Sequence, residues 1–526
     1  MAQSKVFLRD ATGLVREMGF TDVLTTAALN MSIGMGILWL LAFGPGVAPG
    51  GDLVLGTAIM TIMMTIGGMS WVLLGAAMPR SGGDYVFLGR VLYPAIGVGT
   101  SAVWYFANIL FGGMGAAWVP ETGIPTLAYA LNRPDIAAMA TTPPVLIVVG
   151  TIVLAGEAVM LIVSLRGYFK FQLANFVIGM IMLVAVLLVV GTATNAQFIQ
   201  AFNAFSAQYK SPDYNHILSI GASQGYTYTG YSAAATMAVL PAAYWALGYG
   251  YFSTYMAGEI KNAPKNMALG LIAANVLTGF MMCLTAYVFI QVMGYNFLGS
   301  VDAAWSSGAW TVPNPPYFHI LAGALVMNNP PLLALFGIGL ICWNLILPGL
   351  SLLGMSRILL AWSFDRVAPS WFGSVNERFH APDKAILISF ALCEALLLIY
   401  AFYYSLFEFF TSEVMQAATS FMLIAAAAAV FPFLNKTRKL YELSVVKKYR
   451  LGRIPLMTIC GIVYIITLLT VLYFFVGPVY GELHTITFLE TSSVMVGGII
   501  AWFLIRAYRK RQGLDIMLAY RELPPE

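Results

Sequence analysis

Twelve stretches of the chain are apolar over enough residues to cross a lipid bilayer as helices, and this feature decides what the chain can fold into. About twenty apolar residues span the hydrocarbon core of a bilayer as an α-helix. The stretches centre on Leu29–Leu41, Leu53–Met78, Ala95–Val119, Val145–Leu165, Phe171–Val190, Ala235–Ala257, Leu269–Val292, Leu332–Ala361, Ala385–Leu406, Val414–Phe433, Ile454–Val476 and Thr487–Ile505. Hydrophobic residues make up 60% of the 526 residues and charged residues only 10%, whereas soluble domains carry about 25% charged residues. The sequence therefore predicts an all-α polytopic membrane protein with twelve transmembrane helices.

The lysine and arginine residues predict how the chain is oriented. With the N-terminus in the cytoplasm, all but two of the 27 Lys and Arg residues fall in cytoplasmic segments, the exceptions being Arg133 and Lys210. This asymmetry follows the positive-inside rule and favours an even number of spans, with both termini in the cytoplasm. We expect a multi-pass protein of the cell membrane whose basic loops face anionic lipid, and no nucleic-acid partner.

The sixth apolar stretch carries two glycines in its middle. The segment Ala242–Asn266 is AAYWALGYGYFSTYMAGEIKNAPKN, in which Gly248 and Gly250 flank Tyr249. Glycine is the poorest helix former after proline. Backbone groups that are freed in hydrocarbon cost several kcal/mol each unless protein, water or a bound solute meets them. The pattern therefore predicts a helix that is broken at membrane depth around a lined cavity.

A second pair of glycines lies in the first apolar stretch. It belongs to the run Asn30, Met31, Ser32, Ile33, Gly34, Met35 and Gly36. A break here would point the N–H groups of the second half-helix into the cavity, where they form a site for a carboxylate. Transporters built from inverted repeats place two such discontinuous helices in corresponding positions of their halves. The alternative is that these glycines allow two helices to pack closely.

Three loop segments carry specific motifs. They are MPRSGGDY at Met78–Tyr85, GEIKNAPKN at Gly258–Asn266 and GMSRILLAWSFDRVAP at Gly354–Pro369. Together these motifs resemble those of the amino acid–polyamine–organocation superfamily of transporters, and the resemblance covers the chain from the first span to the tenth. It implies one membrane domain with the LeuT-type fold of five-plus-five inverted repeats. The repeats would be residues 18–193 and 232–433, followed by two further helices in residues 454–507.

The resemblance also implies where the substrate binds. The first and sixth spans would hold it, with main-chain N–H groups on a carboxylate, main-chain carbonyls on an ammonium group, and Trp245 or Tyr249 as a cover. The third span would add Asn108 to the cavity, beside Trp104 and Tyr105, for which ordinary packing is an equal alternative. The predicted substrate-binding residues are Ser32, Ile33, Gly34, Met35, Gly36, Asn108, Trp245, Gly248, Tyr249 and Gly250.

Four charged residues are predicted to act in coupling or gating. Glu157 and Glu394 lie inside the fourth and ninth stretches, where a carboxyl group either carries a proton or is a hydrogen-bonded structural residue. Arg357 and Asp365 belong to the third motif, where they either make contacts at an inner gate or orient the helix end.

The coupling ion is left open between a proton and sodium. Some proton-coupled members of the superfamily carry a lysine in the fifth span, but here the region is Asn175–Met180 without a lysine. Sodium-coupled relatives often have hydroxyl side chains in the eighth span, but this chain has Ile346 and Leu347. Two aliphatic side chains disfavour a sodium site, because sodium needs oxygen ligands.

The predicted function is that of a secondary active transporter or exchanger of amino acids or related amines, working by alternating access as a monomer or homodimer. A channel or a receptor-like solute-binding protein is the alternative, although neither needs paired breaks. A membrane-embedded enzyme is less favoured, because the four histidines fall in predicted loops and the four cysteines suit buried positions. We expect no enzymatic activity, no cofactor and no metal.

Overall fold

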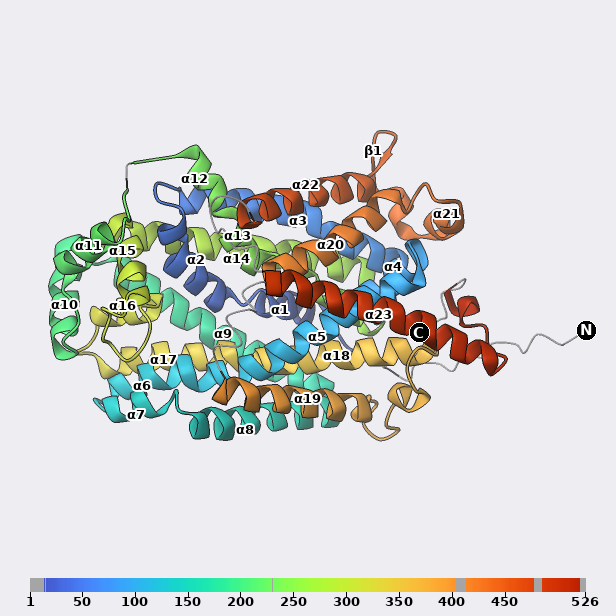
Figure 1. Ribbon diagram of the computed structural model, residues 1–526, viewed down its shortest axis with the longest axis horizontal. Coiled ribbons are helices and arrows are strands. Elements are labelled where there is room, and N and C mark those ends of the chain that lie inside the picture. Colours follow the sequence, from blue (N-terminus) through green and yellow to red (C-terminus); the bar gives the residue numbers. More distant parts are fainter. Residues whose placement is uncertain (1–13, 15, 229, 404–412, 477–484, 521–526) are drawn as a thin grey trace, which may run out of the picture.

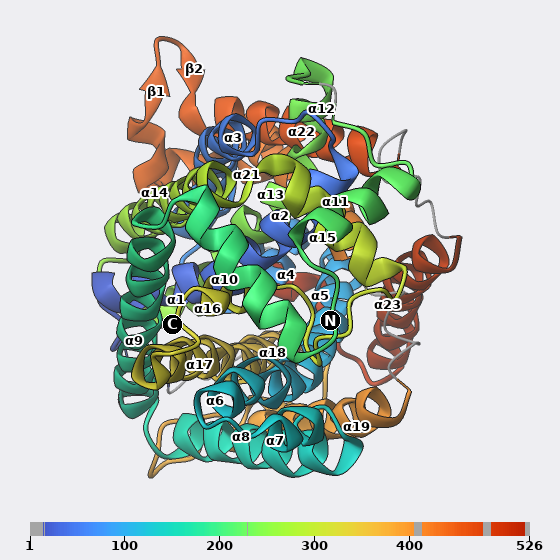
Figure 2. The ribbon, with the colours of Figure 1, turned by 90° about the vertical axis from the view of Figure 1, so that its left-hand side faces the viewer.

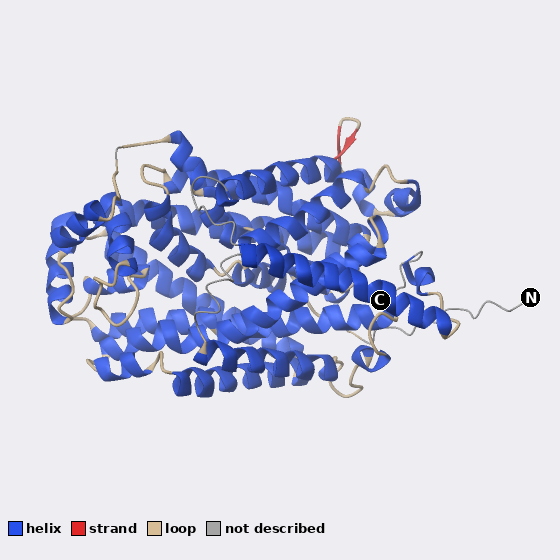
Figure 3. Cartoon of the chain, viewed as in Figure 1, coloured by secondary structure: helices blue, strands red, loops and turns tan. Residues whose placement is uncertain are grey.

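The protein is almost entirely helical in a computed structural model (Figure 3). The structure describes residue 14 and residues 16–228, 230–403, 413–476 and 485–520. In the described residues the sheet is a two-stranded antiparallel hairpin, β1 (Arg450–Leu451) and β2 (Ile454–Pro455). The end of the predicted ninth stretch, from residue 404 to 406, lies outside the described residues.

The helices follow one another in three groups. The first group is α1 (Phe20–Asn30), α2 (Ile33–Val47), α3 (Leu53–Ala77), α4 (Asp84–Val91), α5 (Pro94–Trp118), η1 (Val119–Gly123), α6 (Ile124–Ala130), α7 (Pro134–Met139), α8 (Pro143–Val163), α9 (Leu165–Gly191), α10 (Asn195–Gln208) and α11 (Tyr214–Ser223). The second group is α12 (Ala233–Ala238), α13 (Leu240–Leu247), η2 (Gly250–Glu259), α14 (Ala263–Met293), α15 (Tyr295–Ser306), α16 (Phe318–Ala324), α17 (Pro330–Asn344), α18 (Ile346–Phe364), η3 (Ser370–Gly373), α19 (Asp383–Phe402) and α20 (Glu413–Val430). The third group is α21 (Asn435–Leu443), η5 (Val445–Lys448), α22 (Leu456–Val476), α23 (Thr485–Arg511) and η6 (Ile516–Tyr520).

Nine helices within the described residues are long and apolar enough to cross a membrane. A tenth is added if Ser420–Val430 and Asn435–Leu443, which are bent by 75° at a short break, form one span. This result confirms an all-α polytopic membrane protein. The predicted sixth and twelfth spans are outside this count, the sixth because its chain is divided among α12, α13 and η2. The number twelve therefore stays a prediction.

The long helices run side by side along the long axis of the molecule (Figure 1). Figure 2, which looks along the bundle, shows the shorter helices α10, α11, α15 and α16 lying across one end. Helix α4 and the segment η6 lie at the opposite end. The two ends of the bundle, the α10 end and the α4 end, are therefore built differently.

Glycines bring the helices around α2 into close contact. A Cβ atom on Gly36 would lie 2.5 Å from Cβ of Ala246 in α13, and one on Gly34 would lie 2.1 Å from Cε3 of Trp343 in α17. A Cβ atom on Gly179 of α9 would lie 2.1 Å from Nε1 of the same Trp343 ring. Small residues at such crossings let helix backbones approach closely in a membrane. Gly34 and Gly36 thus make close contacts between helices, which is the alternative that the sequence left open for them.

Enlarging Gly36 is expected to push α2 away from α13. The variant Gly36→Leu should lower the free energy of unfolding by about 1–3 kcal/mol, because the extra atoms overpack a filled contact. Gly156 on α8 is the control, since nothing lies within 4 Å of a Cβ atom placed there. Thermal unfolding of both purified variants in detergent measures the difference, and equal losses in Gly36→Leu and Gly156→Leu would contradict the packing argument.

Candidate functional site

The first membrane-spanning segment is interrupted between α1 and α2. Helix α1 ends at Asn30 and α2 begins at Ile33, with Ser32 between them in the left-handed region at φ 49° and ψ 65°. Few residues other than glycine adopt this conformation. The N–H groups of Met31 and Ser32 still bond back into α1, at 3.0 and 2.8 Å. Because the first N–H groups of a helix have no partner inside it, the first turn of α2 presents free donors at the break.

The position of this break differs from the sequence prediction by a few residues. It falls at Met31 and Ser32, whereas the glycine pair that suggested it, Gly34 and Gly36, lies within α2. The N–H of Gly36 donates to the carbonyl of Ser32 at 2.7 Å as part of the first turn. The donors that face the break therefore belong to Ile33, Gly34 and Met35.

The second interruption lies between α13 and η2. Helix α13 ends at Leu247, and the N–H of Gly248 bonds to the carbonyl of Tyr244 at 2.8 Å. The chain continues from Gly250 to Glu259 as 3-10 helix with a kink at Met256. All ten residues of η2 are buried. Runs of 3-10 helix longer than three or four residues are uncommon and often mark a hinge or strain. This span is therefore wound differently on the two sides of Gly248.

The two interruptions are joined by a hydrogen bond. The side-chain amide of Asn30 donates from Nδ2 to the main-chain carbonyl of Tyr249 at 2.8 Å, across 219 residues of sequence. A Cβ atom on Gly250 would lie 3.4 Å from the sulfur of Met31 and 2.6 Å from Oδ1 of Asn275 in α14. The break in α1/α2 thus lies directly beside the break in α13/η2.

A pocket lies at the two breaks. Its described lining consists of Asn30, Met31, Ser32, Trp104, Asn108, Phe111, Trp118, Trp245, Tyr249, Tyr251, Phe252, Tyr255, Leu347 and Ser351. Eight of these residues are aromatic, and none of the lining residues that the structure describes is charged. The cavity has a volume of about 40 Å³, well below the roughly 300–1,000 Å³ of small-molecule sites, so its lining must move apart to admit a solute.

The structure places the predicted binding residues in two sets. Ser32, Asn108, Trp245 and Tyr249 line the pocket. The others lie in the two broken helices outside the lining, namely Ile33, Gly34, Met35, Gly36, Gly248 and Gly250. Their main-chain groups remain the predicted contacts.

The sequence prediction missed five of the eight aromatic residues of the lining. Phe111 and Trp118 continue the face of α5 on which Trp104 and Asn108 lie, at steps of three, four and seven residues that a helical periodicity would have found. Tyr251, Phe252 and Tyr255 lie beyond the break, where the chain forms 3-10 helix rather than the expected α-helix. Their side chains therefore point in directions that an α-helical periodicity does not give.

Glu157 and Glu394 lie away from this lining. Glu157 of α8 is buried against α18, where a Cβ atom on Gly349 would lie 2.9 Å from its Oε2. Glu394 of α19 accepts a hydrogen bond from the hydroxyl of Thr151 in α8. Glu394 thus joins α19 to α8, whereas no described residue gives either carboxyl oxygen of Glu157 a hydrogen bond. A role for either residue in coupling stays a prediction.

Arg357 belongs to a buried ion pair on the α4 side of the pocket. Its Nη2 lies 2.7 Å from Oε2 of Glu259 and its Nε 2.9 Å from Oε1. Both side chains are at most 3% exposed. The two parallel hydrogen bonds hold the end of η2 against α18, and bidentate pairs of this kind combine strength with a fixed geometry.

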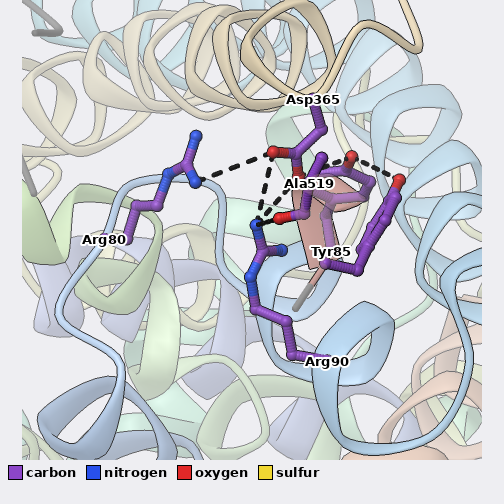
Figure 4. Close-up of polar contacts among 6 residues, drawn as sticks. Arg80, Tyr85, Arg90, Asp365 and Ala519 are labelled. Atoms are coloured by element: carbon purple, nitrogen blue, oxygen red, sulfur yellow. Dashed lines mark hydrogen bonds and ion pairs between the residues drawn. The ribbon is translucent and has the colours of Figure 1, made fainter. Parts of the chain in front are cut away.

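Asp365 anchors a second polar cluster at the same end (Figure 4). Its carboxylate accepts hydrogen bonds from Arg90 at 3.0 Å and from the hydroxyl of Tyr85 at 2.9 Å, and it lies 3.7 Å from Arg80. Asp365 itself is fully buried. Burial and the Asp365 charge raise the pKa of Tyr85 well above its ordinary value, so its hydroxyl remains a donor. This cluster holds α4 against the end of α18.

The segment η6 completes the cluster. The hydroxyls of Tyr520 and Tyr85 lie 2.7 Å apart, and Arg90 donates to the carbonyl of Ala519 at 3.4 Å. The guanidinium carbon of Arg90 also lies 5.3 Å from the centre of the Tyr520 ring. The buried polar groups therefore close the α4 end with residues from three distant parts of the chain.

Metal binding finds little support in the described parts of the chain. No three His, Cys, Asp or Glu side chains there are grouped as metal ligands would be. Cys342, Cys393 and Cys460 are buried and unpaired, and Cys283 is half-buried.

Two interrupted helices that enclose a pocket within a bundle of membrane-spanning helices define the architecture of a membrane transporter. Residues 22–501 match the family model for amino acid permeases, and the chain belongs to this family. Relatives named uncharacterized transporters in Mycobacterium bovis and in two strains of Mycobacterium tuberculosis are 25% identical over 392 residues. That match covers 73% of this chain and 74% of each relative. These findings indicate a transporter rather than an enzyme.

The buried ion pair should behave unlike an exposed one. Removing one partner, as in Glu259→Gln, leaves the Arg357 guanidinium buried without a counter-charge and should lower the free energy of unfolding by about 3–5 kcal/mol. Replacing both residues, as in Glu259→Gln with Arg357→Met, should cost less than the sum of the single variants. Denaturant unfolding of the four proteins in detergent measures this coupling.

The control for this cycle is the exposed pair of Arg133 and Asp135. The variant Arg133→Met should leave stability unchanged within error, because solvent screens such pairs. Additive losses at Glu259 and Arg357 would show that the observed pair does not hold η2 to α18.

Proposed function

We propose that the protein transports an amino acid or a related amine across the cell membrane by alternating access, as a secondary active transporter or exchanger. The observation that carries this proposal is the hydrogen bond between Asn30 and the carbonyl of Tyr249, which joins two interrupted helices at a pocket. Main-chain groups released at such interruptions need partners. A solute that supplies both an acceptor and a donor satisfies them.

The ends of the broken helices suit the two charged groups of an amino acid. The N-terminus of α2 offers the N–H groups of Ile33, Gly34 and Met35 with the positive end of the helix dipole, which favours a carboxylate. The C-termini of α1 and α13 offer carbonyl oxygens with the negative end of their dipoles, which favours an ammonium group. We therefore place the carboxylate at α2 and the ammonium group between Asn30 and Leu247.

The lining narrows the class of side group that fits. Eight aromatic side chains and no described charged one surround the pocket. A charged substrate side chain would lose its water there without gaining a counter-ion, and burying an unpaired charge is costly. An apolar or aromatic side group gains contacts with the rings instead. The preferred substrates are therefore neutral amino acids with apolar side groups.

The two ends of the pocket are closed by different interactions. On the α4 side the closure consists of the ion pairs of Arg357 and Asp365. Toward α15, Trp245 lies 5.4 Å from Trp39 between ring centres, Trp39 lies 4.4 Å from Phe43, and Phe43 lies 6.3 Å from Trp305. Alternating access would break one of these sets while it keeps the other.

The membrane arrangement is part of the proposal. It comprises twelve spans in the LeuT-type arrangement, with residues 18–193 and 232–433 as the two repeats and both termini in the cytoplasm. The α4 end, which carries the basic loops, then faces the cytoplasm. Uptake driven by a proton gradient, by a sodium gradient or by neither identifies the coupling ion.

Uptake into proteoliposomes tests the function. Radiolabelled leucine or phenylalanine should enter saturably and faster when unlabelled substrate is inside, whereas a channel would give conductance without exchange. Arginine, lysine, aspartate and glutamate should compete at least about tenfold less well than neutral apolar amino acids, because a tenfold difference needs only about 1.4 kcal/mol. Stronger competition by a charged amino acid would contradict the proposed side-group preference.

The link between the breaks should matter for uptake more than for folding. The variant Asn30→Leu removes one hydrogen bond, worth about 0.5–1.5 kcal/mol of stability. It should reduce uptake by about tenfold or more, because the two breaks are no longer held in a fixed position relative to each other. Asn215, exposed on α11, provides the matched control Asn215→Leu. Unchanged uptake in Asn30→Leu would remove the main support for the proposed site.

A further inference from the structure

Asp84 is a buried carboxyl group that the function proposed above does not use. It is the first residue of α4 and is 1% exposed. The hydroxyl of Tyr255 donates to its Oδ1 at 2.8 Å. Its Oδ2 is also buried, and no described residue gives that oxygen a hydrogen bond. The side-chain hydrogen bond that the structure gives this carboxyl group thus reaches only Oδ1.

The loop before Asp84 connects it to the pocket. Gly82 and Gly83 have φ values of 115° and 53°, which an L side chain rarely adopts. The N–H of Gly82 donates to the carbonyl of Tyr255 at 3.0 Å, and a Cβ atom on Gly83 would lie 2.7 Å from the Tyr255 ring. Because the ring of Tyr255 also lines the pocket, movement of η2 moves the partner of Asp84.

The charged groups on the adjoining elements are engaged elsewhere. Their contacts are Arg357 with Glu259, Arg80 and Arg90 with Asp365, and Lys436 with the carbonyl of Leu92. The titratable group that faces Asp84 is Tyr255 of η2, and Thr100 of α5 adds a hydroxyl. Among the described residues no cation therefore contacts Asp84.

Burial dominates the protonation of this group. Loss of water raises the pKa of Asp84 to about 7, and the hydrogen bonds from Tyr255 and Thr100 oppose this rise only in part. A carboxyl group that reaches water has its ordinary pKa of 3.8. Opening of the α4 end, which exposes Asp84, therefore lowers its affinity for a proton.

We propose that Asp84 is a proton-binding site that holds a proton while the α4 end is closed and releases it when α4 and η2 separate. The proton enters and leaves from the same aqueous side, so it controls the closure and does not accompany the solute across the membrane. Acid on this side stabilises the closed form, because the closed form binds more protons than the open form.

The size of the effect follows from the two proton affinities. With a pKa of about 7 in the closed form and 3.8 in the open form, the ratio of closed to open protein falls about tenfold between pH 6 and pH 8. Below pH 6 the closed form is mostly protonated and the ratio still increases as the pH falls. The ratio in the wild type therefore depends on pH from about pH 4 to pH 8, and pH 6 to 8 is the part of this range in which a variant without the carboxyl group is compared with it.

Amide hydrogen exchange in lipid nanodiscs tests this proposal without any substrate. Exchange in segments 80–92 and 250–260, corrected for the intrinsic dependence of exchange on pH, should be about tenfold faster at pH 8 than at pH 6 in the wild-type protein. In Asp84→Asn, which is neutral throughout, it should be independent of pH. Tyr255→Phe removes a hydrogen bond to the ionised form and should move the wild-type transition to higher pH.

The control is Asp135→Asn, since Asp135 is exposed and paired with Arg133. It should keep the wild-type transition. A flat wild-type profile between pH 6 and pH 8, or a transition that persists in Asp84→Asn, would overturn the proposal. If Asp84→Asn does not fold, Tyr255→Phe tests the proposal alone: a transition at higher pH supports it, and an unchanged or lower transition overturns it. None of these measurements requires transport. A result that contradicts the proton-binding proposal is therefore distinguishable from a result that contradicts the proposed transport of neutral amino acids.

Discussion

The structure depends on how the main-chain N–H and C=O groups of two interrupted membrane helices find hydrogen-bond partners away from water. Where α1 gives way to α2 and α13 to η2, main-chain groups lose their helical partners at the same place in the bundle. The Asn30 side chain supplies one partner, through its hydrogen bond to Tyr249, and leaves other groups facing a pocket. The requirement that polar groups be paired in hydrocarbon thus accounts for the contact between the two broken helices, and in the proposed function it also accounts for the site of a zwitterion.

The two ends of the pocket differ in the kind of energy that closes them. Buried ion pairs at Glu259 and Asp365 have a fixed geometry and cost much to separate singly. The rings of Trp39, Phe43 and Trp245 at the other end are held by non-directional contacts that can slide. The titratable group Asp84 lies among the polar contacts and not among the aromatic ones, so its proton acts on the α4 end.

Sequence reasoning found the class of fold and the region of both breaks, because apolar length and paired glycines are local signals. It placed the first break in the run from Asn30 to Gly36, and the structure puts the break at Met31 and Ser32, since Ser32 adopts the left-handed conformation and Gly34 packs against Trp343 inside α2. It did not foresee the contact of Tyr85 with Tyr520, which are 435 residues apart, or that of Asp84 with Tyr255, which are 171 apart. Such pairs leave no periodic trace in a single sequence and appear only when the helices are assembled.

The winding of η2 has a mechanical consequence. The segment is wound as a 3-10 helix on both sides of a kink at Met256. A 3-10 helix rises about 2.0 Å per residue and an α-helix about 1.5 Å, so a change to α-helical winding would shorten this element while its ends remain covalently attached to α13 and α14. The segment can act as a tether of two lengths, with the bidentate pair at Glu259 fixing the longer one.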